Sequence, residues 1–365
     1  MPPVEEARTI LSLRGRRPVL HWGVLLTATI FFIWLLELIH LPAALLLGAM
    51  AAAILVASAE GRVTVPAWPY LLAQGLVGCL IARSIGPGIL VTMLQQWPIF
   101  LLSITAVIVF STALGIILAR WKVLPGATAV WGSAPGAATV MTLMAEAFGG
   151  DVRLVAFMQY LRVVFVALVA SVVSRLWVSP GTGALPATVW FPETAAGPFV
   201  ATLALAAFGA FAGTRLKIPA GPLLVPLFLG VALSGAHIVT ITLPPWLLAI
   251  CYTLVGWTIG LRFTRDIVLH AARAFPQVAA SILALIALCG GLAYVLHLVT
   301  GTDALTAYLA TSPGGADSIA IIAASTKVDM PFVVAMQTGR FLLVLFIGPS
   351  LARLVARWTL RNSPA

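Results

Sequence analysis

Residues 131–138 read WGSAPGAA and residues 309–316 read LATSPGGA, and each stretch interrupts an apolar part of the chain. The two stretches lie 178 positions apart. The same offset relates polar residues further along: Asp151 and Asp329, Gln159 and Gln337, Arg162 and Arg340, and Arg175 and Arg353. Polar residues kept twice inside apolar sequence indicate a shared structural or functional need. We therefore interpret the chain as two copies of one unit.

The composition is that of a polytopic membrane protein. Hydrophobic residues make up 61% of the chain and charged residues only 9%, whereas soluble globular domains carry roughly 25% charged residues. Apolar runs of roughly 17–25 residues, the length that crosses a membrane as a helix, begin near His21, Pro42, Pro66, Pro98 and Val152, and again near Phe199, Ile218, Pro244, Pro276 and Asp329. The expected fold is all-α, with about five spans and one broken or re-entrant helix in each copy.

The expected organisation follows from these runs. Residues 1–18 form a cytoplasmic N-terminal tail, 19–176 the first membrane repeat, 177–198 an external linker, 199–357 the second repeat and 358–365 a cytoplasmic tail. The first apolar run lacks a small-residue cleavage site, so it is interpreted as a retained span and not as a signal peptide. The linker contains Pro180, Pro186 and Pro192, which disfavour a continuous helix.

Loop charges indicate that the two repeats are inverted, because Lys and Arg concentrate on the cytoplasmic side of membrane proteins. If the broken segments dip in and return, most basic residues fall inside, with Arg83, Arg175 and Lys327 as exceptions. If the broken segments cross fully, more basic residues fall outside. The net charge of +10 is scattered over span ends, which is topogenic charge and not a nucleic-acid surface.

Both interrupting stretches predict a helix broken in the middle of the membrane. Pro135 and Pro313 each remove a backbone donor, and Gly136, Gly314 and Gly315 permit unusual backbone angles. Broken helices are tolerated at membrane depth where they line a cavity, and paired breaks indicate a transporter site. Small polar side chains accompany the breaks at Ser133, Thr311 and Ser312. We expect these residues to line a substrate site; the alternative is a simple proline kink.

Arg162 and Arg340 lie about ten residues into spans of roughly 25, close to the bilayer midplane. An unpaired Arg there costs at least ~2.5 kcal/mol, so each should face a partner, a cavity or an anion. Gln159 and Gln337 lie three residues earlier, on the same helix face. The guanidinium fork suits a carboxylate, which predicts a small anionic substrate. The alternative is a structural Arg that satisfies broken-helix carbonyls or pairs with an internal acid.

Asp317 follows the second break, whereas the first copy has Thr139 at the equivalent position. This asymmetry makes Asp317 the candidate for coupling to a proton or sodium ion, or for the internal partner of an Arg. Asp151 and Asp329 open the Arg-bearing helices, where capping is the expected role. Glu37 is the other acid deep in an apolar run, within residues 31–41, and the alternative is that it lies near the external end of its span.

No motif supports cofactor or metal chemistry. The histidines are isolated, and Cys79, Cys251 and Cys289 lie unpaired in apolar runs, which predicts packing. The sequence lacks a Walker loop, a dinucleotide fingerprint and a nucleophile elbow. We expect no cofactor and no enzymatic activity.

The motifs SAPGAA and SPGGAD, each followed by a helix with the pattern MQ-x-x-R, resemble the AbrB-type duplicated membrane protein family of bacteria. The resemblance spans about residues 20–357. It implies an inner-membrane protein of poorly defined activity, distinct from the small DNA-binding regulators that share the name, and it supplies no catalytic residues. Members are often described as regulators or ammonia monooxygenases.

The hypothesis that the sequence favours is a secondary transporter of a small organic anion, which works by alternating access. Its oligomeric state is left open, with a homo-oligomer as one alternative. The alternative hypothesis is a membrane sensor or regulator without transport, which the short tails disfavour. A membrane monooxygenase is a third hypothesis, and it would need a cofactor for which the sequence shows no ligands.

Overall fold

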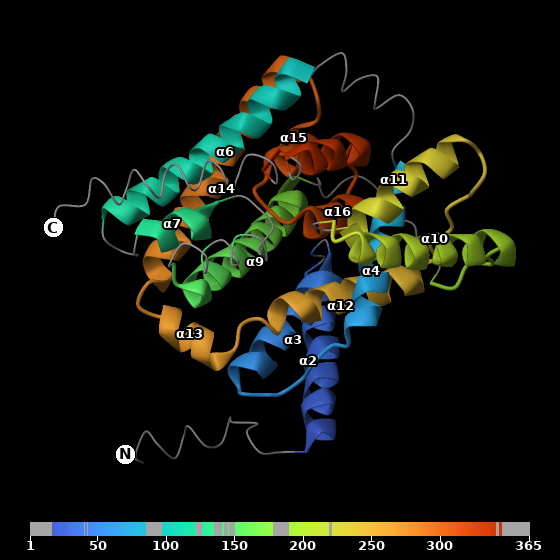
Figure 1. Ribbon diagram of the computed structural model, residues 1–365, viewed down its shortest axis with the longest axis horizontal. Helices are drawn as coiled ribbons and strands as arrows, with labels where there is room; N and C mark the ends of the chain where they lie inside the picture. The colour runs from blue at the N-terminus through green and yellow to red at the C-terminus, as the bar shows by residue number, and fades with distance from the viewer. Residues whose placement is uncertain are drawn as a thin grey trace.

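The structure, a computed structural model, describes residues 17–39, 41, 43–84, 97–121, 126–134, 141, 145, 150–177, 190–218, 221–340 and 343–344; at Asp317 it describes the backbone alone. The chain is α-helical throughout these ranges (Figure 1). The helices are α2 (Pro18–Leu38), α3 (Ala44–Ser58), α4 (Ala67–Ser84), α6 (Trp97–Arg120), α7 (Gly126–Ser133), α9 (Val152–Trp177), α10 (Ala196–Arg215), α11 (Gly221–Gly235), α12 (Pro245–Gly260), α13 (Arg265–Ala271), α14 (Phe275–Thr300), α15 (Ala304–Thr311) and α16 (Ala316–Ala324). A further helix covers residues 330–340.

The helices follow the apolar runs of the sequence. A helix begins within three residues of every predicted start. Among the described residues, α2, α6, α9, α10 and α14 are long and apolar enough to cross a membrane. The pair α12 and α13, bent by 54° at its break, would make a sixth span. The protein is therefore a multi-pass membrane protein. Two further apolar helices, α3 and α11, have 15 residues each, and such a helix rises ~22 Å, less than the hydrocarbon core.

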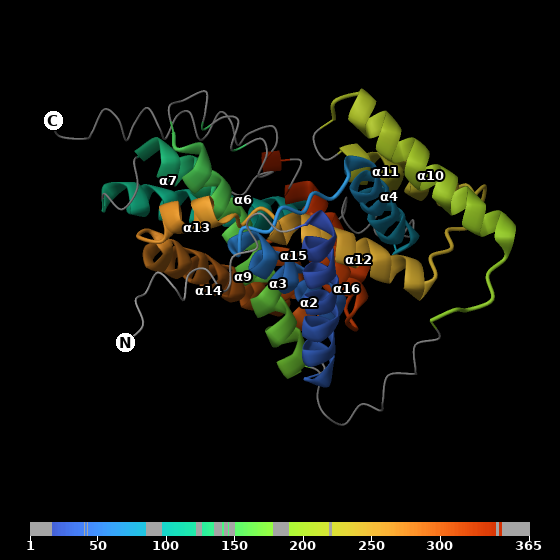
Figure 2. The same ribbon diagram turned by 90° about the horizontal axis from the view of Figure 1, so that it is seen from below.

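The helices pack into two groups, each drawn from both halves of the chain. The α4 group contains α2, α3, α4, α10, α11 and α12, and the α9 group contains α6, α7, α9, α14 and α15. Figures 1 and 2 both show most of the α9 group on the left and α4, α10 and α11 on the right. Helix α16 packs against α9 and α4, and α13 packs against α9 and α3, so these two short helices connect the groups.

Glycines allow the α4 group to pack backbone against backbone. A methyl group at Gly256 of α12 would lie 2.6 Å from the carbonyl oxygen of Leu46 in α3, and one at Gly260 would collide with that of Met50. Both positions are far inside van der Waals contact. Small residues at helix interfaces allow such close packing in membranes, where dispersion contacts drive association. The α3–α12 interface is therefore specified by these two glycines.

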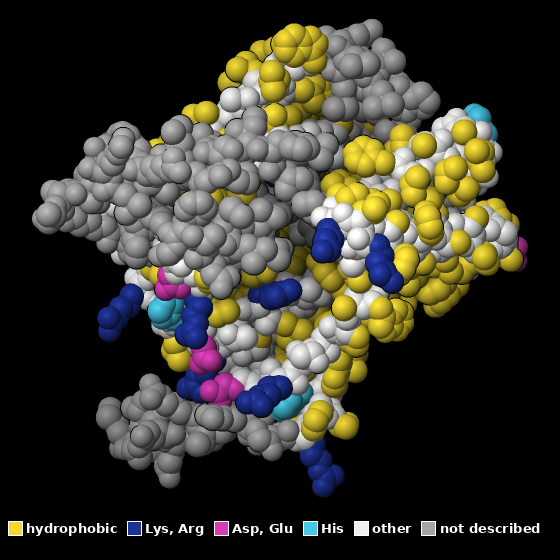
Figure 3. Space-filling view, in the orientation of Figure 1, with side chains coloured by type: hydrophobic (Ala, Val, Ile, Leu, Met, Phe, Trp, Pro, Cys, Tyr) yellow, Lys and Arg dark blue, Asp and Glu magenta, His cyan; other side chains and the backbone are white. Residues whose placement is uncertain are grey.

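Charged side chains gather around α13. Arg265 forms an ion pair with Glu60, at the end of α3, at 3.0 Å. The guanidinium of Arg262 lies over the ring of Tyr160 in α9, 5.7 Å from its centroid. Figure 3 shows basic, acidic and histidine side chains together on the lower part of this face, whereas hydrophobic side chains cover its right side. This separation is expected of a protein with one polar surface in water and an apolar belt in lipid.

Two expectations about individual residues are confirmed. Cys79, Cys251 and Cys289 are free and buried, as predicted for packing residues. Glu37 is exposed and lies one residue before the end of α2, which agrees with the alternative that placed it near the end of its span. The first-half break at Pro135 and Gly136 lies outside the described residues.

Candidate functional site

The predicted break at Pro313 is confirmed. Helix α15 ends at Thr311, the backbone is extended at Ser312 (φ −55°, ψ 131°) and at Gly315 (φ −74°, ψ 139°), and α16 begins at Ala316. Gly314 and Gly315 do not have the expected positive φ, because the one glycine with positive φ in the described part of the chain is Gly301. A methyl group at Gly314 would instead meet Ile319 and Val166 at 2.9 Å. Gly314 is therefore required by close packing of the break against α9.

Each glutamine replaces the backbone donor that a proline lacks. In an unbroken helix, the carbonyl of Leu309 would accept from the N–H of residue 313, which is proline. The Nε2 amide of Gln337 donates to that carbonyl at 2.7 Å, and Gln159 donates to the carbonyl of Trp131, four residues before Pro135, at 3.0 Å. The second hydrogen of each amide goes to the carbonyl of Ser312 at 3.0 Å or of Ala134 at 2.9 Å. The glutamines thus complete the C-terminal ends of α7 and α15.

The arginines bind the same helix ends. Arg340 donates to the carbonyls of Ser312 at 2.5 Å and Gly314 at 2.7 Å. Arg162 donates to the carbonyl of Ala134 at 3.0 Å. Each guanidinium also donates to the side-chain oxygen of its glutamine, at 2.6 Å in the Arg340 pair and 2.7 Å in the Arg162 pair. The predicted shared face of Gln and Arg is confirmed, and most of the donors expected to hold a substrate are engaged with carbonyls.

Both arginines are buried and lack a carboxylate partner among the described side chains. Each is 6% exposed. The ion pairs that the structure gives within the described ranges are Arg265–Glu60 and His270–Asp151. Each guanidinium is a positive charge inside the apolar part of the chain. Helix C-termini supply partial negative charge, but the carbonyl dipoles leave a net double positive charge here. Asp317 lies in the first turn of α16, and its pairing stays a prediction.

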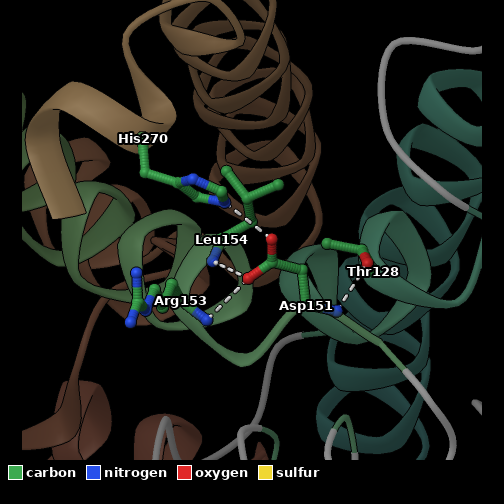
Figure 4. A network of polar contacts seen from close by, with 5 residues as sticks. All are labelled: Thr128, Asp151, Arg153, Leu154 and His270. Carbon is green, nitrogen blue, oxygen red and sulfur yellow. Dashed lines mark hydrogen bonds and ion pairs between the residues drawn. The ribbon is translucent and has the colours of Figure 1, made fainter. Parts of the chain in front are cut away.

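The aspartates cap the arginine-bearing helices, as predicted. Asp151 Oδ1 accepts from the N–H groups of Arg153 and Leu154, and its Oδ2 contacts Nε2 of His270 at 2.7 Å (Figure 4). Burial acts to raise the pKa of Asp151, but the bond to His270 and the two N–H groups together lower it. Asp329 accepts in the same way from Phe332 at 3.0 Å. His270 comes from α13, and no sequence spacing related it to Asp151.

Hydroxyl groups complete the arrangement, and of those that donate or accept here the sequence analysis assigned Thr311 but not Ser111, Thr128 or Thr306. Thr128 and Thr306 accept from the N–H groups of Asp151 and Asp329, at 2.9 and 3.1 Å. Ser111 in α6 donates to the carbonyl of Ser133, and Thr311 donates to that of Cys289 at 3.2 Å. The identity of Thr128 and Thr306 at the common offset was a signal that could have found the first pair. In the described part of the chain, no three His, Cys, Asp or Glu side chains could together hold a metal ion.

Comparison with known proteins places this arrangement in a family. The profile of the family described as "Transition state regulatory protein AbrB" matches residues 45–356. The chain belongs to the AbrB family of membrane proteins. An Escherichia coli member named "Putative regulator AbrB" is 42% identical over 347 residues, which cover 95% of this chain and 99% of the relative. A Bacillus subtilis protein named "Uncharacterized protein YhjN" is 27% identical over 303 residues, 78% of each chain.

Proposed function

We propose that this AbrB-family protein is a secondary transporter of a small organic anion, with carboxylates as the first class to test. The observation that carries the proposal is the pair of buried arginines without a described acidic partner. A buried charge is costly unless it is paired, so such residues in membrane spans mark ion or substrate paths. A bound anion would offset this buried positive charge.

The break in the second half provides a place for the anion. The N-terminus of α16 has no side-chain cap among the described residues, and the first N–H groups of a helix attract negative charge. Arg340 binds the carbonyl of Gly314, next to this N-terminus. The positive charge of Arg340 and the dipole of α16 therefore act on the same region. Ser312 and Gly315 lie in it, and Asp317 would couple transport to a proton or sodium ion.

The two helix groups suggest how access could alternate. The α4 group packs through backbone contacts at Gly256 and Gly260 and would serve as the fixed part. The α9 group carries both arginines and the helices α7 and α15. Equivalent hydrogen bonds at Gln159 and Gln337 support two copies of one unit, and we propose that the copies are inverted. In this proposal the chain crosses the bacterial inner membrane ten times, and both termini are cytoplasmic.

Flux in proteoliposomes tests the function. Purified protein would be reconstituted and uptake of labelled small carboxylates measured for the wild type, Arg340→Gln, Arg340→Lys and Arg175→Gln. Arg175 is exposed at the end of α9, so Arg175→Gln removes an equal charge away from the site. We expect Arg340→Gln to abolish uptake, Arg340→Lys to retain part of it and Arg175→Gln to match the wild type. Uptake by Arg340→Gln equal to that of the wild type would refute the role of Arg340.

A regulator without transport is the alternative, because the E. coli relative is named a regulator. Absence of flux for every carboxylate, together with a specific partner that binds the folded protein, would favour it. Melting curves of each variant show whether a loss of flux reflects unfolding.

A further inference from the structure

A small cavity lies beside Arg162, at the contact between the two halves of the chain. Its volume is about 20 Å³, and its walls come from α6, α7, α9 and α14. The polar side chains that line it are Ser111, Ser133, Arg162 and Ser281, and the remaining lining is glycine, methionine and aliphatic side chains. The cavity therefore has an apolar wall and a cluster of hydrogen-bond donors.

Two of these donors have no hydrogen-bond partner in the described part of the chain. They are the Nε–H of Arg162 and the hydroxyl of Ser133. Arg162 is more than nine-tenths buried, and its other contacts leave Nε free. Buried donors are almost always satisfied, so an orphaned pair that lines one cavity indicates an occupant that accepts hydrogen bonds. Ser111 uses its hydroxyl on the carbonyl of Ser133 and helps to fix the wall.

Charge and size narrow the class of occupant. No carboxylate lines the cavity, so a cation would find no ligand of opposite charge. One water molecule needs a volume of ~10–15 Å³. The cavity, at about 20 Å³, is only slightly larger and is too small for a carboxylate with a carbon chain. We propose that the cavity binds a monoatomic halide, with chloride as the physiological ion. The halide accepts from Arg162 Nε and Ser133 Oγ, which belong to the first half of the chain. Ser281 lines the cavity from α14, in the second half.

This inference deepens the proposed function, since it rests on Arg162 serving as charge for an anion. The halide would be a second anion, separate from the transported one at the α16 break. It would offset the buried charge of Arg162. Chloride would then be required for the arrangement of α7 and α9 on which transport depends.

Melting temperature in halide titrations tests the site. Purified protein in sodium methanesulfonate would receive increasing sodium chloride or bromide at constant total salt. A ligand that binds the folded state raises the melting temperature by mass action, so both halides should stabilise the wild type with saturation. Ser133→Ala should weaken the apparent affinity at least ~10-fold, because a hydrogen bond to a charged partner is lost. Ser281→Ala should weaken it as well.

Ser103→Ala is the matched control, because Ser103 is equivalent to Ser281 at the common offset, is buried and does not line the cavity. Equal halide stabilisation of all variants, or none in the wild type, would overturn the proposal and leave the cavity to water. Halide stabilisation that depends on Ser133, without carboxylate flux, would support this site and refute the transport function. Carboxylate flux without a halide effect would support the transport function and refute the halide site.

Discussion

Replacement of Gln337 by Met should destabilise the protein by about 2–4 kcal/mol. The substitution keeps the volume and removes three hydrogen bonds, to the carbonyls of Leu309 and Ser312 and from Arg340. Ser312 retains its bond from Arg340, whereas Leu309 loses the donor that stands in for Pro313. A buried acceptor left without a partner costs about 1–3 kcal/mol, and each further lost bond about 0.5–1.5 kcal/mol. Unfolded membrane helices also find partners, which favours the lower end of the range.

The measurement is the melting temperature of purified protein in detergent. Globular proteins unfold with an entropy of ~2.1 cal/mol/K per residue. For 365 residues, this makes a loss of about 2–4 kcal/mol equal to a decrease of roughly 3–5 °C. Gln74→Met is the control, because the amide of Gln74 donates to the hydroxyl of Tyr70 and to no orphaned carbonyl in the described residues. That variant should shift the melting temperature by about 1 °C or less.

A double variant tests the reason for the loss. Pro313→Ala restores a backbone N–H four residues after Leu309 and allows α15 to continue through Ser312, which is extended in the wild type, so that the helix satisfies its own carbonyl. The decrease caused by Gln337→Met should therefore be smaller in the Pro313→Ala background. An equal decrease in both backgrounds would refute the idea that Gln337 replaces the missing donor, as would a Gln337→Met variant as stable as the wild type.

Two further predictions concern packing and pH. Gly256→Ala should destabilise the protein by about 1–3 kcal/mol, because the added methyl group overpacks against Leu46. Gly290→Ala should stabilise it by about 0.5–1 kcal/mol, because a methyl group there meets nothing within 4 Å. Melting curves compare the two variants, and equal effects would contradict the close α3–α12 contact. Asp151→Ala should lose a helix cap worth about 0.5–2 kcal/mol at neutral pH. Because the folded-state pKa of Asp151 is lowered from 3.8, this stability is present above that pH and lost as pH falls through the lowered value, so the two melting temperatures should converge in acid; a constant gap would disprove the contribution of the carboxylate.

The positions of the chemically important residues could be predicted from the sequence. A polar residue in an apolar span is conspicuous, so Arg162, Gln159 and their equivalents were identifiable, as was the break at Pro313. Their contacts were left open between an anion and the helix carbonyls. In the structure, both side chains bind carbonyls at the broken helix ends. The physical reason is that the break leaves backbone acceptors without helical donors.

Other parts of the site depend on elements far apart in the sequence. The cavity beside Arg162 needs Ser281 from α14, and the cap at Asp151 includes His270 from α13. Neither relation has a spacing or a repeat that could reveal it. The apolar runs are also nearly uniform in hydrophobicity, so their composition does not say which helix packs against which.

From the sequence alone, one could predict the membrane class, the starts of the ten expected spans, the break at Pro313 and the paired Arg and Gln. These follow from local properties, namely hydropathy, the missing proline donor and the high cost of a charge in lipid. The tertiary structure alone decided the division into an α4 group and an α9 group and the partners of each guanidinium. Helix pairing in a membrane depends on close surface fit, as at Gly256, and on which carbonyls come within reach of a donor. Surface fit and the reach of a donor both depend on which residues lie close together in the folded protein, and the order of residues along the chain does not give this.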